Sequence, residues 1–420
     1  MSLLLDTVRN KNLQSIWSAV LVSTIGNFLL MLSLSVYIWR ETGSNFLASA
    51  VFAVQWGAII LSPPLITYLL KRVPAARLAA YSEWTGGIVT VTIGLFVEQI
   101  WLVFILLVAR GLAESISKSA RIVSLKTSVP DKLLGRAASL FGTGTFIGIA
   151  FGSLLGAGLV EIFPLKWIAV IDGVTFLISG FLFYTLWKRT GSQPHATAQS
   201  EGSWRQSFSV LKSMPLLRRN FVWVILTTAL LQGFHNVGRT LLPIELLDLG
   251  EQGVMLLQAI ASVSFFLGAL FVTVMMQDES NPWVRLPWLI ALFSITLMQA
   301  SLMIPIVWIS LLSYALYLFV FEIAFTFCQK NLVVQCPESS MGAISSTAQS
   351  MSTLGMVVMI LAGGAMSDWI GIQLTGWMFC GVFVVTLLLV ELPTFLQQRN
   401  KIQLSLKEEE NGQLAKERLE

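Results

Sequence analysis

The sequence predicts an all-α membrane protein with twelve transmembrane helices in two six-helix, pseudo-symmetric bundles. Its composition is the first indication, because 55% of the 420 residues are hydrophobic and only 12% are charged. Soluble domains are about a quarter charged. The mean hydropathy of +0.75 agrees with a lipid environment. The second indication is a series of long apolar segments, and the third is the concentration of Lys and Arg in alternate loops.

The apolar segments divide into six, a polar interval, and six more. A transmembrane helix needs roughly 20 mostly apolar residues. The expected spans are residues 14–39, 46–70, 76–97, 100–124, 134–161, 166–187, 220–247, 253–276, 284–303, 306–334, 341–367 and 372–396. The first is longer than the apolar part of a signal peptide, about 7–15 residues, so we expect it to be retained.

The polar interval defines the expected domain organisation. It is rich in Ser, Gln and basic residues, which is typical of a linker. We therefore predict an N-terminal six-helix bundle at 1–188, a cytoplasmic linker at 189–219, a C-terminal six-helix bundle at 220–398 and a charged cytoplasmic tail at 399–420.

The distribution of Lys and Arg predicts the orientation. Loops on one side of the predicted spans carry Arg9, Lys11, Lys71, Arg72, Arg77, Lys132, Arg136, Lys188, Arg189, Arg205, Lys212, Arg218, Arg219, Arg285, Arg399 and Lys401. The other side carries little more than Arg40 and Lys166. Cytoplasmic loops are enriched in basic residues, so both termini and the linker are expected in the cytoplasm. The net charge of +4 is attributed to these loops rather than to nucleic-acid binding.

The fourth predicted span carries an unusual stripe of charge. At 100° per residue, Glu114, Lys118 and Arg121 lie about 40°, 80° and 20° from Arg110 on the helical wheel. A charge at the bilayer centre costs about 2.5–3.5 kcal/mol on insertion scales, so the stripe is expected to face protein. Arg110 and Glu114 either line a water-accessible central cavity or form an i,i+4 ion pair. Lys118 and Arg121 either belong to the cavity mouth or extend to the headgroups.

Four titratable residues are candidates for proton coupling, and Glu322 ranks first. It lies in "YLFVFEIAFTF" without an obvious local cation. Burial without a cation favours the protonated form of a carboxyl group, which can bring its protonation into a useful pH range. Glu114 is a weaker candidate, because Arg110 one turn away favours its ionised form. Asp172 and His235 complete the set, and His235 can titrate near neutral pH. Structural hydrogen bonding across helices is the alternative role for each.

Polar and aromatic residues within the spans predict a substrate cavity. Pockets for drug-sized molecules are mostly apolar, with a few placed polar groups. The candidate lining residues are Arg110, Asn27, Gln55, Trp56, Gln232, Asn236, Arg239, Gln258, Tyr314 and Tyr317. Simple packing is the alternative role for the aromatic members.

Several function classes are not supported. The chain has no GxxxxGK[ST] phosphate loop, only two histidines and no recognisable nucleophile–base pair. Its three cysteines lie in apolar stretches and have no metal-ligand or disulfide spacing. We therefore expect no enzyme activity, no cofactor and no metal site.

A longer stretch, "SARIVSLKTSVPDKLLGRAASLFGTGTFIGIAFGSLLGAGL", resembles the fourth and fifth helices of the major facilitator superfamily. The resemblance is greatest to the branch that contains enterobactin exporters and macrolide efflux proteins. Its fifth-helix antiporter signature is matched in spacing by Gly148, Gly152, Ser153, Gly156 and Ala157, although small residues replace the family's proline and two of its glycines. Small residues four apart allow close helix contact.

The resemblance also has departures. Many relatives have Gly-Asp in the first span, where this chain has Gly26-Asn27, so that carboxylate cannot be its proton site. The loop after the second span has Thr67 and Lys71 where relatives carry Gly and Asp, which weakens the expected charge relay between conformations.

The resemblance implies a secondary active transporter that exports a small amphiphilic compound, such as a siderophore, an antibiotic or a peptide-like natural product. Proton antiport with alternating access is the implied mechanism. The implied setting is a bacterial inner membrane, with substrate, protons and lipid as partners, no nucleic acid, and a monomeric state. Two other functions remain open: a lipid or lysolipid flippase on the same fold, and a non-transporting membrane receptor or partner protein.

Overall fold

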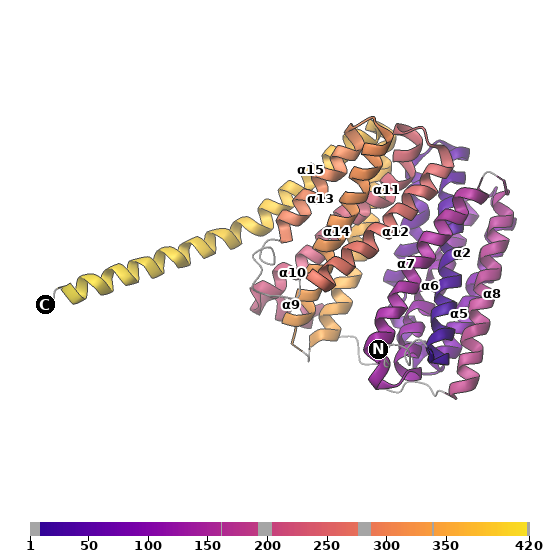
Figure 1. The fold of residues 1–420 in the computed structure, drawn as a ribbon, viewed down its shortest axis with the longest axis horizontal. Coiled ribbons are helices and arrows are strands. Elements are labelled where there is room, and N and C mark those ends of the chain that lie inside the picture. The colour runs from indigo at the N-terminus through magenta and orange to yellow at the C-terminus, as the bar shows by residue number, and fades with distance from the viewer. Residues whose placement is uncertain (1–8, 161, 192–203, 276–286, 338–339, 418–420) are drawn as a thin grey trace. The chain divides into compact units, whose positions relative to one another are not determined.

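The structure is a computed structural model that describes residues 9–160, 162–191, 204–275, 287–337 and 340–417 (Figure 1). All regular elements within these residues are helices. The chain divides into two units, Met1–Gly376 and Trp377–Glu420, and each is described by itself.

The first set of helices in the larger unit contains α2 to α8. Their bounds are α2 Lys11–Thr42, α3 Asn45–Leu61, α4 Pro63–Leu70, α5 Ala75–Leu95, α6 Ile100–Ser128, α7 Asp131–Leu159 and α8 Leu165–Thr190. Helix α2 packs on α3, α7 and α8, while α5 packs on α6 and α8. Helix α6 also packs on α3.

The second set begins after the linker. Its bounds are α9 Trp204–Ser213, α10 Pro215–Leu226, η1 Thr227–Gln232, α11 Gly233–Leu241, η2 Leu242–Leu246, α12 Gly250–Met275, α13 Pro287–Met303, α14 Val307–Gln335 and α15 Met341–Glu417. The segments η1 and η2 are π-helical turns inside one continuous span, Pro215–Leu246. Helix α14 packs on α10, α12 and α13, and α12 also packs on α7 of the first set.

The predicted spans correspond to α2, α3 with α4, α5, α6, α7, α8, α10 to η2, α12, α13, α14 and two parts of α15. Among the described residues, seven helices are long and apolar enough to cross a membrane, or eight if the bent pair α3–α4 counts as one span. Helix α13 is shorter, and α15 holds the last two predicted spans. Gly371 breaks its helical geometry with φ 75° and ψ 163°, a conformation that glycine adopts without steric cost.

The turn between α2 and α3 is set by local chemistry. Gly43 ends α2 in the left-handed region with φ 65°, and its N–H donates to the Trp39 carbonyl. Ser44 then caps α3, because its Oγ accepts from the Leu47 N–H at 3.2 Å. Glycine after a helix and serine before the next are the residues preferred at these positions.

The small residues of α7 allow close contact with its neighbours. A side chain at Gly148 would meet Thr24, and one at Gly152 would overlap the α2 backbone at Ile25. A side chain at Gly156 would meet Met255 of α12 at 2.7 Å. Ser153 donates to the Ile149 carbonyl of its own helix at 2.7 Å, and the Ala157 side chain lies outside the described residues. The signature therefore lies where α7 meets α2 and α12, and its role in transport stays a prediction.

The smaller unit, from Trp377, continues α15 as a helix through Glu417. Residues 192–203 of the predicted linker lie outside the described part of the chain. The domain boundaries after residues 188, 219 and 398 stay predictions.

Candidate functional site

Arg110 of α6 is fully buried, and each of its three guanidinium nitrogens has a hydrogen-bond partner. Its Nε donates to Thr90 Oγ1 at 2.8 Å, and its Nη1 donates to Asn27 Oδ1 at 2.8 Å and Gln55 Oε1 at 2.7 Å. Its Nη2 forms an ion pair with Asp172 Oδ2 at 2.6 Å, with both side chains 0% exposed. Arg110 therefore links α2, α3, α5 and α8. Its predicted i,i+4 partner, Glu114, is not the acid with which it pairs.

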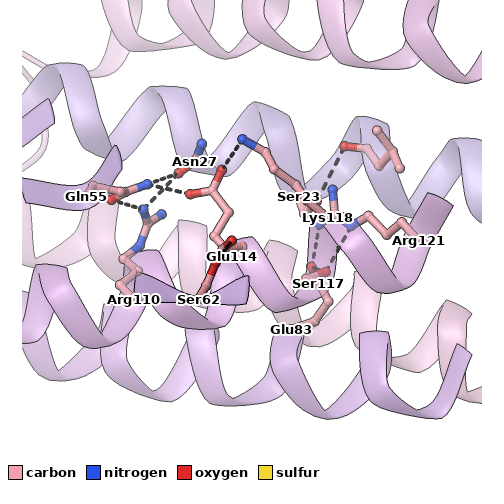
Figure 2. A network of polar contacts seen from close by, with 12 residues as sticks. Ser23, Asn27, Gln55, Ser62, Glu83, Arg110, Glu114, Ser117, Lys118 and Arg121 are labelled. Atoms are coloured by element: carbon pink, nitrogen blue, oxygen red, sulfur yellow. Dashed lines mark hydrogen bonds and ion pairs between the residues drawn. The ribbon is translucent and has the colours of Figure 1, made fainter. Parts of the chain in front are cut away.

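Glu114 is connected to Arg110 through the Gln55 amide, as Figure 2 shows. Gln55 Nε2 donates to Glu114 Oε2 at 2.6 Å and to Asn27 Oδ1 at 3.1 Å, while its Oε1 accepts from Arg110. Lys118 Nζ pairs with Glu114 Oε1 at 3.1 Å, and the Lys118 side chain is 51% exposed. The Gln55 amide thus connects the buried Arg110 to the solvent-accessible Glu114–Lys118 ion pair.

Arg121 forms a second buried ion pair, with Glu83 of α5 (Figure 2). Its Nη2 also donates to Ser23 Oγ at 2.8 Å, and its Nε donates to Ser117 Oγ at 3.0 Å. The Ser117 hydroxyl donates to Glu83 as well. Arg121 is thus held inside the helix packing. Sequence reasoning missed Glu83, although an acidic residue in the third predicted span was a signal for it.

A cavity of about 300 Å³ lies between the two sets of helices within the larger unit. Helices α2, α3, α6 and α7 contribute one wall, and α10, η1, α14 and α15 the other. The lining residues are Asn27, Phe28, Trp56, Ile59, Glu114, Lys118, Thr145, Ile149, Val224, Thr228, Gln232, Phe325, Gln329, Leu332, Ala348, Gln349, Ser352, Thr353 and Met356. This wall mixes an ion pair, amides and hydroxyls with large apolar groups.

The cavity includes some predicted substrate residues and leaves others behind its wall. Asn27, Trp56, Gln232 and Glu114 are lining residues, while Arg110 lies behind them. Their roles in transport stay predictions.

The predicted polar residues of α11 form a buried group near the cavity. His235 Nδ1 is hydrogen-bonded to the Tyr314 hydroxyl at 2.9 Å, and Asn236 Nδ2 donates to the Gln232 carbonyl at 2.7 Å. Arg239 Nη1 donates to Gln258 Oε1 at 2.9 Å. All of these side chains except that of Gln232 are buried.

Two further predicted residues of α14 lie apart from the cavity lining. The Tyr317 hydroxyl donates to the Leu231 carbonyl. Glu322 accepts from Thr326 Oγ1 at 2.7 Å, and its Cβ and Cγ lie against Gly268 of α12. Glu322 is therefore part of the α12–α14 contact.

The two sets of helices contact each other at the α2–α3 turn. Asp368 of α15 accepts from the Asn45 N–H at 2.6 Å, the Phe46 N–H at 3.1 Å and Ser44 Oγ at 3.1 Å. A carboxylate at a helix N-terminus is stabilised by the free N–H groups and the helix dipole. These contacts join α15 of the second set to the start of α3 in the first set.

Comparisons with known proteins agree with this architecture. The Major Facilitator Superfamily model matches residues 16–358, which is most of the chain. The uncharacterized MFS-type transporter YfiS of Bacillus subtilis (strain 168) is 21% identical over 403 residues, covering 91% of this chain and 93% of YfiS. YkuC of the same organism, also an MFS-type transporter, is 24% identical over 245 residues, covering 56% of this chain and 55% of YkuC.

Solved structures show the same fold. The POT family transporter PepTSo has a TM-score of 0.74 at 14% identity, covering 93% of this chain and 98% of that one. The nucleoside transporter NupG has a TM-score of 0.71 at 17% identity, covering 91% of this chain and 98% of that one. Helix order, a cavity between two sets of helices and the family match lead to one conclusion: the chain is a multi-pass membrane transporter that belongs to the Major Facilitator Superfamily.

Proposed function

We propose that this transporter exports a small amphiphilic compound, such as a siderophore, an antibiotic or a peptide-like natural product, in exchange for protons. The observation that carries the proposal is the cavity shared by the two sets of helices. Its wall offers Trp56, Phe325 and Met356 to an apolar body and the Glu114–Lys118 pair to polar groups. A site placed between two halves suits alternating access.

The contacts at the α2–α3 turn support an inward-open state. With both termini in the cytoplasm, that turn lies on the outer side, where Asp368 and the Arg40–Glu251 ion pair join the two sets. The half-exposed Lys118 lies nearer the cytoplasmic end of α6. Export then requires the outer contacts to break while the cytoplasmic side closes, and the bound substrate shifts the populations of these states by its differential affinity.

Glu322 is the proposed proton carrier. Asp172 and Glu114 each form an ion pair with a cation, Arg110 and Lys118. Among the described residues, Glu322 forms no ion pair, and its recorded partner is the neutral Thr326 hydroxyl. Because Glu322 lies at the contact between α12 and α14, gain or loss of its proton would alter the packing of these two helices. A change in helix packing can favour one conformation over another.

The proposal is tested by transport into inverted membrane vesicles, with and without a proton uncoupler. The panel contains siderophores, macrolides and peptide antibiotics, together with a nucleoside and a dipeptide because structural neighbours are named as nucleoside and peptide transporters. Uptake of a panel member that is lost with the uncoupler and in Glu322→Gln supports proton-driven export.

Glu98→Gln is the matched control, because Glu98 is an exposed carboxylate in the turn after α5. It is expected to leave uncoupler sensitivity intact. Uncoupler-insensitive uptake with unchanged kinetics in Glu322→Gln would contradict proton coupling through this residue. The absence of transport for every panel member would contradict the proposed substrate class.

A further inference from the structure

Arg239 of α11 is a buried cation that lacks an anionic partner. Its side chain is 1% exposed, and its Nη1 donates to the neutral Gln258 amide at 2.9 Å. Its Nε and Nη2 have no hydrogen-bond partner among the described residues. No carboxylate of the described residues lies within ion-pair distance of it.

The unpartnered atoms have a specific geometry. In a guanidinium group, the Nε–H and one Nη2–H point in parallel from the same edge, and this edge matches the two oxygens of a carboxylate. In Arg239 the other nitrogen, Nη1, is the one held by Gln258. The free edge is therefore the edge that binds a carboxylate in bidentate fashion.

The other buried arginines of the site show that such a free edge is unusual here. Arg110 has a partner on each of its three nitrogens, including the Asp172 carboxylate. Arg121 is paired with Glu83. A buried charge without a partner is strongly destabilising. An unpaired Arg239 is therefore explained if a bound ligand supplies the missing negative charge.

Arg239 lies next to the cavity, in contact with one of its lining residues. Its guanidinium carbon lies 3.5 Å from the centre of the Phe52 ring and 5.6 Å from that of Trp56. Trp56 is itself a lining residue, so its ring contacts both the cavity and the Arg239 guanidinium. Beyond Arg239, the hydroxyls of Ser35 and Thr240 lie 3.4 Å apart and join the two sets of helices.

We infer that Arg239 binds a carboxylate group of the substrate, which reaches its free edge when the half-buried Trp56 side chain moves aside. The inference rests on the proposed function and narrows its substrate class to amphiphiles with one carboxylate. A monoanion matches the single positive charge, whereas a phosphate dianion would leave one charge unbalanced in a buried place. The apolar body of the substrate would occupy the cavity against Trp56.

The first test measures binding to the purified full chain in detergent by isothermal titration. The probes are 1-naphthylacetate, its neutral amide 1-naphthylacetamide, and 1-naphthyl phosphate. We expect the wild type to bind the acid about tenfold or more tighter than the amide, because a bidentate charged pair is lost in the amide. Arg239→Gln should reduce this preference to less than about threefold.

Lys188→Gln is the matched control, because Lys188 is an exposed cation in the last turn of α8. It should keep the full preference for the acid. Equal or undetectable binding of acid and amide by the wild type, or an undiminished preference in Arg239→Gln, would overturn the inference. Tighter binding of 1-naphthyl phosphate than of the acid would overturn the assignment to a carboxylate.

A second measurement needs no ligand and keeps the inference testable if a variant folds poorly. Arg239→Met retains a long apolar stem against Phe52 and removes the unpaired charge. Its thermal unfolding midpoint should equal or exceed that of the wild type, whereas Arg110→Met should lower it. An equal decrease in both variants would mean that Arg239 is a structural cation and would overturn the inference. Both tests measure the solubilised chain, so a failure of proton-coupled transport leaves them unaffected.

Discussion

The Arg110–Asp172 ion pair gives a prediction whose size follows from the structure. Arg110→Met removes the guanidinium and leaves the Asp172 carboxylate at 0% exposure, with the Thr175 hydroxyl at 3.3 Å as a remaining side-chain donor. Removing one member of a buried pair costs about 3–5 kcal/mol, because the other charge remains buried. The lost hydrogen bonds to Thr90, Asn27 and Gln55 belong to the same network and do not add independently.

The predicted loss converts to a measurable shift in thermal unfolding. An unfolding entropy of about 2.1 cal/mol/K per residue, applied to 420 residues, gives about 0.9 kcal/mol per degree. A loss of about 3–5 kcal/mol therefore lowers the midpoint by about 3–6 °C. The assay is tryptophan fluorescence of the purified protein in detergent during heating.

A double-mutant cycle distinguishes a charge effect from a general packing defect. Asp172→Leu alone should also destabilise, because it leaves Arg110 without its acid. The double variant Arg110→Met/Asp172→Leu should recover much of the loss, since apolar replacement of a buried pair is often neutral. A loss in Arg110→Met below about 1 kcal/mol, or additive losses in the double variant, would refute the reasoning.

Three further predictions concern packing and local contacts. Gly26→Ala should destabilise the protein by about 1–3 kcal/mol through overpacking, because the added Cβ would overlap the α8 side chains of Asp172 and Thr175. The control is Gly158→Ala, whose added Cβ meets nothing within 4 Å, and it should be neutral or stabilising in the same thermal assay. Asp368→Asn removes the charge that caps α3. It should increase labelling by a membrane-impermeant reagent of a cysteine placed at Asn45, which is 5% exposed and contacts Asp368 through its backbone N–H; unchanged labelling would argue against an outer closure at this contact. Glu83→Gln should cost about 1–3 kcal/mol by weakening a charge-assisted pair, and wild-type thermal stability would contradict it.

The helix pattern was predictable because it depends on local properties. Apolar length and glycine or proline breaks are visible in the sequence, and the predicted span at residues 14–39 lies within α2, Lys11–Thr42. The broken span at α3–α4 and the π-helical turns η1 and η2 were not predicted. Such turns depend on how a span packs against its neighbours, which hydrophobic periodicity does not report.

The charged stripe of α6 was predicted to face protein. Arg110 and Arg121 do so, whereas Lys118 is 51% exposed, and the partners of the two arginines were not predicted. A helical wheel places Glu114 near Arg110, whereas the acid that pairs with Arg110 comes from α8, 62 residues along the chain. The relative rotation of α6 and α8 decides that pairing, and no single-helix pattern contains it. For the same reason Glu83, on α5, was missed as the partner of Arg121.

The sequence predicted the mixed polar and apolar character of the cavity better than it predicted which residues line it. Trp56 and Gln232 were expected and line it, while Gln329 and Ser352 line it without having been expected. Both lie within predicted spans, and the sequence does not show which face of each helix meets the cavity. That face is seen only when α14 and α15 are placed against the first set of helices.

The most direct test of the account is substrate protection of a cysteine in the cavity. Gln349 lines the cavity and its side chain is exposed, so Gln349→Cys is introduced into a chain whose natural cysteines, Cys328, Cys336 and Cys380, are replaced by serine. The variant is labelled with a small thiol reagent in inverted vesicles, with and without the panel compound that shows uncoupler-sensitive uptake. The cysteine should be labelled, and the transported compound should suppress the labelling. Labelling at the same rate with and without the compound would contradict the claim that this cavity holds the substrate.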